Sequence, residues 1–168
     1  MDSTFRLPDT EFDAAVVRLS RLTAGNFLVA DDAPQTYEEL IRQVEGQGVF
    51  IVWSGSSEQT IYSDPQINFA FRAWHDWCHW RGRHDFSPAG EIAVARMQRK
   101  QLIALYGDTP HTRLWCRIID AEVVGQMLYR QLHGDFPADQ RAFVATYLDV
   151  RAIAADTRHG RSGRQSSW

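Results

Sequence analysis

The residues best suited to chemistry lie together in the middle of the chain, in the stretch 71–85, which reads FRAWHDWCHWRGRHD. Its centre holds two histidines four residues apart, His75 and His79, with Asp76 directly after the first. On an α-helix, side chains at positions i and i+4 share one face. Two imidazoles spaced in this way can bind one metal ion through their ring nitrogens. The stretch therefore predicts one wall of a metal site.

The element that would carry this pair is a helix with clear start and stop signals. Asp64 and Pro65 supply an N-cap residue followed by proline at the first helical position, and Gly82 ends the pattern. The apolar stripe of this helix contains Ile67, Phe71, Trp74 and Cys78. Both histidines lie on the shoulder of that stripe, so we expect them to face the interior or its margin.

Two later helices are predicted to direct carboxylates toward the same interior. Ser87-Pro88 opens a helix that runs to about residue 106, and Glu91 heads its apolar stripe. A longer helix, predicted over 112–132, carries Glu122 at the centre of its apolar face. A carboxylate on a core face is unfavourable unless it is paired or bound to a metal, so Glu122 is the stronger ligand candidate. The structural alternatives are a helix-dipole role for Glu91 and a pairing of Glu122 with Arg72.

Together these side chains predict one mononuclear metal centre. The expected ligands are His75, His79 and Glu122. Two histidines and a carboxylate leave one position open for water, which is the arrangement of catalytic zinc sites. We therefore favour one divalent zinc ion, and the same ligand set could also hold iron or manganese.

Four further residues are expected around the ligands. Asp76 or Glu91 would orient or deprotonate the bound water as the catalytic group. Arg72 and Gln126 would bind substrate or hold the ligands through hydrogen bonds.

The spacing His75-Asp76-x-x-His79-x-x-Gly82-x-x-Asp85 also resembles the metzincin signature of zinc proteases. Asp replaces both the general-base Glu and the third His of that signature, and no recognisable Met-turn follows. We therefore do not adopt a metzincin assignment, and we keep Asp85 only as a reserve ligand, that is, a possible further ligand of the metal.

From residue 71 onward the chain resembles a group of small, poorly characterised phage and prophage proteins. Their pattern runs R-A-x-H-D, a nearby H, G-E at a helix start, and E-x-x-G-Q about thirty residues later. Here it corresponds to Arg72 to Asp76, then His79, Gly90-Glu91, and Glu122 to Gln126, in the middle third of the chain. The resemblance implies a phage or mobile-element origin and supplies no activity.

Three functions fit these observations. The favoured one is a metal-dependent hydrolase that acts on a small or macromolecular substrate. The second is a carboxylate-bridged di-iron oxidoreductase. This chain lacks the Glu-x-x-His pairs usual in such proteins, because Val94 and Gly125 stand three residues after Glu91 and Glu122. The third is a phage accessory protein that is not an enzyme, binds a host protein and holds these side chains in a buried polar network.

The whole chain predicts a single, mainly α domain over residues 1–156, a bundle of about six helices with one small β-hairpin near 49–63. The hairpin strands are expected at Val49–Trp53 and Thr60–Tyr62, and 26–35 is expected to be a loop. Residues 157–168 are basic and rich in Gly and Ser, which predicts a disordered tail.

Composition limits the partners and the compartment. A net charge of −3 gives no general attraction to nucleic acid, so such contact is expected only through the basic tail. The sequence has no apolar run long enough for a membrane span and no signal-peptide pattern. Only two cysteines, Cys78 and Cys116, are present, which suits reduced thiols and a cytoplasmic location.

Overall fold

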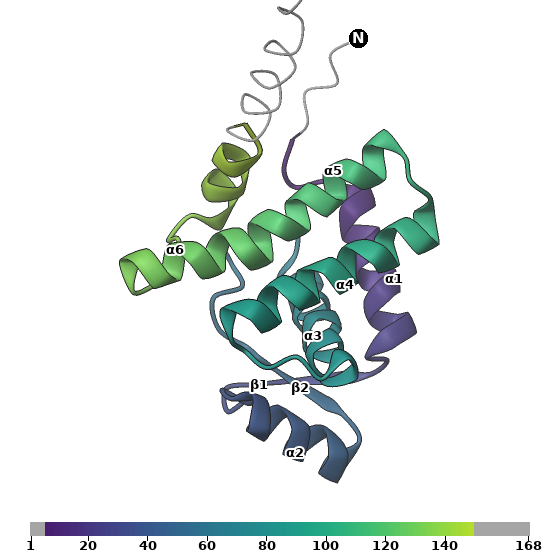
Figure 1. Cartoon of the computed structure of the whole chain (residues 1–168), viewed down its shortest axis with the longest axis vertical. Helices are drawn as coiled ribbons and strands as arrows, with labels where there is room; N and C mark the ends of the chain where they lie inside the picture. The colour runs from purple at the N-terminus through teal and green to yellow at the C-terminus, as the bar shows by residue number, and fades with distance from the viewer. Residues whose placement is uncertain (1–5, 150–168) are drawn as a thin grey trace, which may run out of the picture.

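The computed structural model describes residues 6–149, and over this range the chain is mainly helical (Figure 1). The expected mainly α fold is therefore confirmed. The helices are α1 Thr10–Thr23, α2 Tyr37–Gln47, α3 Pro65–Gly82, α4 Pro88–Tyr106, α5 Pro110–Ile119 and α6 Gln126–His133. Residues 140–149 are helical as well. The predicted domain end at 156 and the predicted tail at 157–168 lie outside the described residues.

Side-chain caps followed by proline start three of the helices. Asp64 accepts a hydrogen bond from the amide of Gln66 at the start of α3, and Ser87 accepts one from the amide of Gly90 at the start of α4. Thr109 does the same for α5. A cap satisfies a free amide of the first turn, and proline lacks the amide that would otherwise stay unpaired there. The starting points of the helices that carry the site are thus determined locally.

The small β element is a two-stranded parallel sheet, so the predicted hairpin near 49–63 is wrong. Strand β1, Phe27–Ala30, pairs with β2, Phe50–Trp53, with Phe27 opposite Phe50. Parallel strands need a long crossover, which α2 supplies. Residues 60–62 form no strand, and Ile61 and Tyr62 are buried in the main core instead. The apolar character of this segment reflects core packing.

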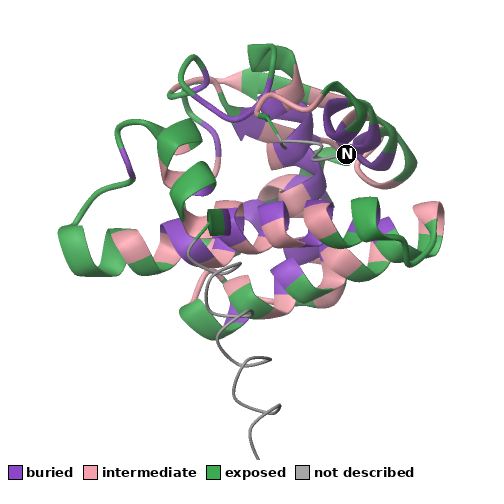
Figure 2. Ribbon diagram, turned by 90° about the horizontal axis from the view of Figure 1, so that it is seen from above, coloured by how far each residue is buried: buried purple, intermediate pink, exposed green. Residues whose placement is uncertain are grey.

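The main core surrounds α3. Trp74 is fully buried, and its indole N–H donates to Gln101 Oε1 of α4 at 2.7 Å. Phe12 of α1, Leu102 of α4 and Ile118 of α5 belong to the same buried cluster. Figure 2 shows that the buried residues gather on the inward faces of the helices. Helix α3 is therefore held from several sides, which fixes the side chains it presents.

The predicted long helix over 112–132 is interrupted by a change of helical period. A π-helical segment, η1 Asp120–Gly125, lies between α5 and α6 in one continuous rod (Figure 1). A π-helix bonds residue i to i+5, so it holds more residues per turn than an α-helix. The side chains after Ile119 are consequently rotated relative to a regular helix, and Glu122 is among them.

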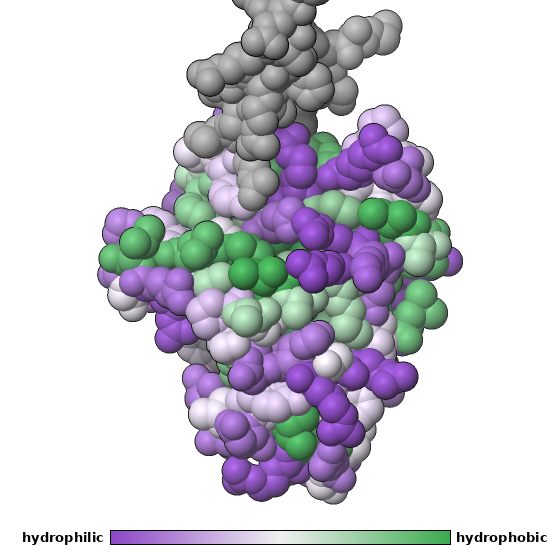
Figure 3. Space-filling view, viewed as in Figure 1, coloured by the Kyte–Doolittle hydropathy of each residue, from purple (hydrophilic) through white to green (hydrophobic). Residues whose placement is uncertain are grey.

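Within the part of the chain that the structure describes, helix α6 has large apolar side chains that are exposed. Leu132 is 81% exposed and Leu128 is 47% exposed. Figure 3 shows hydrophobic side chains gathered over this helix at the left edge of the molecule. Even so, none of the helices in the described part of the chain combines the length and the apolar character needed to cross a membrane.

Candidate metal centre

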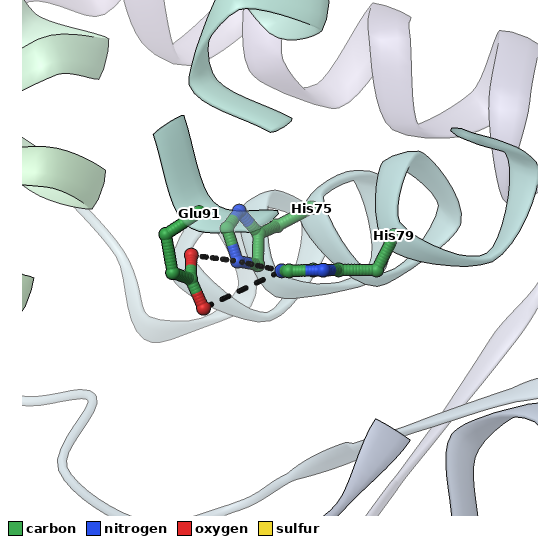
Figure 4. A group of neighbouring side chains, drawn as sticks. All are labelled: His75, His79 and Glu91. Carbon is green, nitrogen blue, oxygen red and sulfur yellow. Dashed lines mark hydrogen bonds and ion pairs between the residues drawn. The ribbon is translucent and has the colours of Figure 1, made fainter. Parts of the chain in front are cut away.

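Three side chains from two neighbouring helices converge on one point. His75 and His79 extend from α3, and Glu91 extends from the first turn of α4 (Figure 4). The two Nε2 atoms lie 3.0 Å apart. Glu91 Oε2 lies 3.3 Å from His75 Nε2, and Glu91 Oε1 lies 3.5 Å from His79 Nε2. Among the described residues, this is the one group of at least three potential ligands within 4.8 Å of one another.

A tight connection between α3 and α4 brings Glu91 to the histidines. Helix α3 ends with Arg83 in a left-handed conformation at φ 53°, and Ser87 caps α4 only four residues later. Gly90 is buried, and a Cβ atom there would lie 1.9 Å from the carbonyl oxygen of Asp85. Only glycine permits this close approach. Gly90 therefore allows the connection to pack onto the start of α4, directly before the ligand candidate Glu91.

Backbone and side-chain acceptors fix the orientation of both imidazole rings. His79 Nδ1 lies 2.9 Å from the carbonyl oxygen of His84, which can only accept, so Nδ1 carries a proton. His75 Nδ1 lies 3.4 Å from Gln98 Oε1, which also accepts. In the neutral rings, both Nε2 atoms then carry lone pairs. Two lone pairs at this separation repel each other unless a cation lies between them, so the arrangement calls for a metal ion or a proton.

The charges in the cluster favour a cation in the same place. Burial raises the pKa of Glu91, but His75 and His79 outweigh this effect and hold it well below its usual range. Burial lowers the pKa of His75, but the charge and hydrogen bond of Glu91 outweigh burial and raise it overall. Glu91 is therefore an ionised carboxylate whose negative charge is available to a metal ion or to a protonated His75.

A cavity of about 440 Å³ gives access to the cluster from one side. His75 and Glu91 lie on its wall, together with the aromatic rings of Phe71 and Phe86. His79 is fully buried behind them, and its ring packs edge-on against Phe86 at 4.7 Å between centroids. A ligand in the cavity could therefore reach an ion held by the three side chains, while protein shields the other side.

The structure does not place Glu122 among the ligands, so the predicted set His75, His79 and Glu122 is corrected to one with Glu91. Glu122 lies elsewhere on the cavity wall and accepts a hydrogen bond of 2.7 Å from Gln126. Burial raises the pKa of Glu122 to about 8, against the lowering effects of Gln126 and Arg72. The prediction failed because it assumed a regular α-helical period through residues 120–125, where the helix is π-helical.

Two other predicted residues have different surroundings from those expected. Arg72 donates to the backbone carbonyls of Trp53, Gly55 and Ser56 and stacks over the Trp53 ring, so it anchors the end of β2. Asp76 is partly buried and does not line the cavity, although burial raises its pKa to about 6.

Asp85, the reserve ligand, accepts hydrogen bonds from Ser87 in the connection and does not join the cluster. Its carboxylate is therefore used to shape the loop before α4.

Sequence reasoning missed the direct contact of Glu91 with the two histidines and the contact of Gln98 with His75. Both lie on one face of α4, seven residues apart, and Gln98 is fully buried despite its polar amide. A buried amide on the face that carries the first-turn glutamate was the available signal. Gln98 holds His75 through the ring nitrogen that faces away from the cluster, which is how metal-binding histidines are commonly oriented.

No protein-family model, curated protein or solved structure matches this chain. The resemblance to phage and prophage proteins stays a prediction. The function is therefore argued from the geometry of the site.

Proposed function

We propose that the protein binds one divalent metal ion, with zinc favoured, through His75, His79 and Glu91, and that it is a metal-dependent hydrolase. The observation that carries the proposal is the spacing of the donor atoms: the two Nε2 atoms lie 3.0 Å apart, and one carboxylate oxygen of Glu91 lies 3.3 Å from His75 and the other 3.5 Å from His79. One ligand atom from each of the three residues can be chosen so that all lie within 4.8 Å of one another. Ligand atoms around a tetrahedral zinc ion lie about 3.3 Å apart, given zinc–ligand distances of about 2.0–2.1 Å. The residues present therefore fit such an ion.

The roles of the residues follow from their positions. Two histidines and one carboxylate leave a coordination position open, and the cavity lies on the side of His75 and Glu91. A zinc ion held there would acidify a bound water molecule and polarise a carbonyl or phosphoryl oxygen. Glu91 supplies the negative charge of the site, and Gln98 and the His84 carbonyl orient the two rings.

Glu122 takes the proton-transfer role in this proposal, in place of Asp76 or Glu91. It lies on the wall of the same cavity, and with a pKa of about 8 it exchanges a proton near neutral pH. Gln126 holds one of its carboxyl oxygens in place. The rings of Phe71 and Phe86 form apolar parts of the wall of this space.

The alternative functions have less support from the same geometry. A di-iron centre needs several bridging carboxylates, and the cluster in residues 6–149 contains only Glu91. Two histidines and one carboxylate also suit a mononuclear iron(II) centre, so the metal content has to be measured. A purely structural network would place a proton on His75 and bind no metal.

Zinc titration of the metal-free protein tests the ligand set. We expect one equivalent to bind to the wild type, and Glu91→Gln to weaken binding about 100-fold or more, because a neutral amide replaces the anionic ligand. Glu122→Gln and His133→Ala are the matched controls, because Glu122 lies outside the cluster and His133 is an exposed residue of α6. Both controls should keep wild-type affinity.

A lack of zinc, iron and manganese binding by the folded wild type would refute the metal centre. Equal loss of affinity in Glu122→Gln and Glu91→Gln would refute the ligand set. Hydrolysis is tested separately with 4-nitrophenyl acetate and bis(4-nitrophenyl) phosphate. Cleavage should require the metal and should be lost in Glu91→Gln, and metal binding without any such cleavage would count against the hydrolase.

A further inference from the structure

Arg130 of α6 lies at the wall of the cavity beside the candidate metal site, and it forms no ion pair with any residue that the structure describes. It lines both the cavity of about 440 Å³ and an adjoining cleft of about 1110 Å³. Its guanidinium lies 4.9 Å from the centroid of the Phe136 ring. Within residues 6–149, no carboxylate forms an ion pair with it. Its guanidinium N–H groups are thus available to a molecule that enters.

The other arginines near this region are already engaged. Arg72 donates to three backbone carbonyls, and Arg141 donates to the carbonyls of Thr60 and Tyr62. Arg99 is paired with Asp120. Arg72 also lies over an aromatic ring, but its guanidinium is used in hydrogen bonds as well. Among the described residues, Arg130 contacts the face of the Phe136 ring and donates no side-chain hydrogen bond, so its hydrogen-bonding edge is available.

The rest of the cavity is mostly apolar. Its wall includes Phe71, Phe86, Val123 and Met127 in addition to Phe136. Small-molecule sites are typically apolar with a few placed polar groups that fix orientation. In this cavity the polar side chains are those of His75, Glu91, Glu122, Arg130 and Gln131, and Arg130 is the cation among them that can bind an anion without the metal.

We propose that the substrate is a small molecule with an apolar body and an oxyanion, a carboxylate or a phosphate, and that Arg130 binds this oxyanion. The proposal rests on the hydrolase assignment for the reaction, whereas binding of the anion does not require the metal. The planar guanidinium can form two parallel hydrogen bonds to either oxyanion. The apolar body would occupy the aromatic part of the cavity, with the bond to be cleaved directed toward His75 and Glu91.

Binding to the metal-free protein tests the proposal without interference from a metal–anion bond. The probes are 3-phenylpropanoate, phenyl phosphate and the uncharged 3-phenylpropanol, titrated by calorimetry at pH 7 and low ionic strength. We expect at least one anion to bind about tenfold more tightly than the alcohol, as charge-assisted hydrogen bonds commonly allow. The stronger of the two anions identifies the carboxylate or the phosphate as the favoured group.

Substitutions then assign the preference to Arg130. Arg130→Gln should remove the tenfold preference, and Arg130→Lys should keep part of it, because lysine retains the charge without the planar pair of donors. Arg21→Gln is the matched control, since Arg21 is an exposed arginine on α1 outside the cavity. Equal binding of anions and alcohol, or an unchanged preference in Arg130→Gln, would overturn the proposal.

The zinc titration distinguishes this inference from the proposed function. Arg130→Gln should bind zinc as the wild type does, because Arg130 is not part of the ligand cluster. A wild type that binds no metal but keeps the anion preference would refute the metal centre and support the role of Arg130 in binding. A wild type that binds zinc without any Arg130-dependent preference would refute the substrate class alone.

Discussion

Gly90→Ala is the substitution that tests most directly how the fold positions the metal ligands. A Cβ atom at this position would lie 1.9 Å from the carbonyl oxygen of Asp85 and 2.8 Å from its carbonyl carbon. Ordinary carbon–oxygen contacts are well above 3 Å, so the backbone has to move by more than an ångström. Because the obstacle is backbone, rotation of a side chain cannot relieve it.

Two effects are expected from this displacement. Overpacking of this kind destabilises a protein by about 1–3 kcal/mol, and a backbone obstacle places Gly90→Ala toward the upper end. The second effect is on the adjacent Glu91, whose carboxylate would leave its place beside His75 and His79. Metal sites tolerate changes of only about 0.2 Å in ligand distance, so we expect zinc affinity to fall at least about tenfold.

Urea unfolding and zinc titration of the same samples measure the two effects. Gly46→Ala is the matched control, because Gly46 lies in α2, has no left-handed backbone, and has no atom within 4 Å of the position that a Cβ would take. Alanine is a better helix former, so the control should be stabilised by up to about 1 kcal/mol, with unchanged zinc affinity. Wild-type stability and wild-type zinc affinity in Gly90→Ala would refute the positioning role of the glycine.

Three further substitutions probe the cavity, the ring orientation and the core. With a folded-state pKa of about 8 and an ordinary value of 4.5, Glu122 retains a proton that the unfolded chain releases, so wild-type stability should fall as pH rises from 4.5 to 8. The free energy of unfolding of metal-free Glu122→Gln, relative to that of the wild type, should therefore rise by up to about 1.4 kcal/mol per pH unit in that window. If urea unfolding shows that this difference in stability does not change with pH, the raised pKa is contradicted. Gln98→Leu removes the acceptor for His75 Nδ1 and should weaken zinc binding about 10- to 100-fold while the helical circular dichroism is retained; unchanged affinity would show that the amide does not orient the ring. Trp74→Ala should lower the free energy of unfolding by about 3–5 kcal/mol, and a loss below about 1 kcal/mol would mean that Trp74 is not central to the core.

The features that could be predicted from the sequence are those encoded by neighbouring residues. Asp64-Pro65 and Ser87-Pro88 start α3 and α4 as expected, because a cap and a proline act within one turn. The i, i+4 spacing likewise placed His75 and His79 together, since it depends only on the regular period of α3.

The features that were not predicted depend on distant partners or on a change of period. The strand at Phe50–Trp53 pairs with Phe27–Ala30 across a helix, and nothing local distinguishes this pairing from a hairpin. Glu122 was assigned to the wrong position because the π-helical segment cannot be read from the apolar pattern. Glu91 was expected near the site as a catalytic group, and its direct contact with both histidines was not predicted because that contact depends on the path of the connection through Gly90.

The proposed metal ligands and the opposite wall of the cavity come from different segments of the chain, so the wall can vary in sequence without a change of ligands. All three proposed ligands lie within the segment 75–91, on two helices joined by one short connection. Much of the opposite cavity wall comes from residues 122–131, on a different helical rod, and from Gly134 and Phe136 directly after that rod. Substitutions in that rod can therefore change the size, polarity or charge of the space while the ligands stay in place. If the proposed metal centre is present, it could in this way serve different substrates through changes in that wall alone.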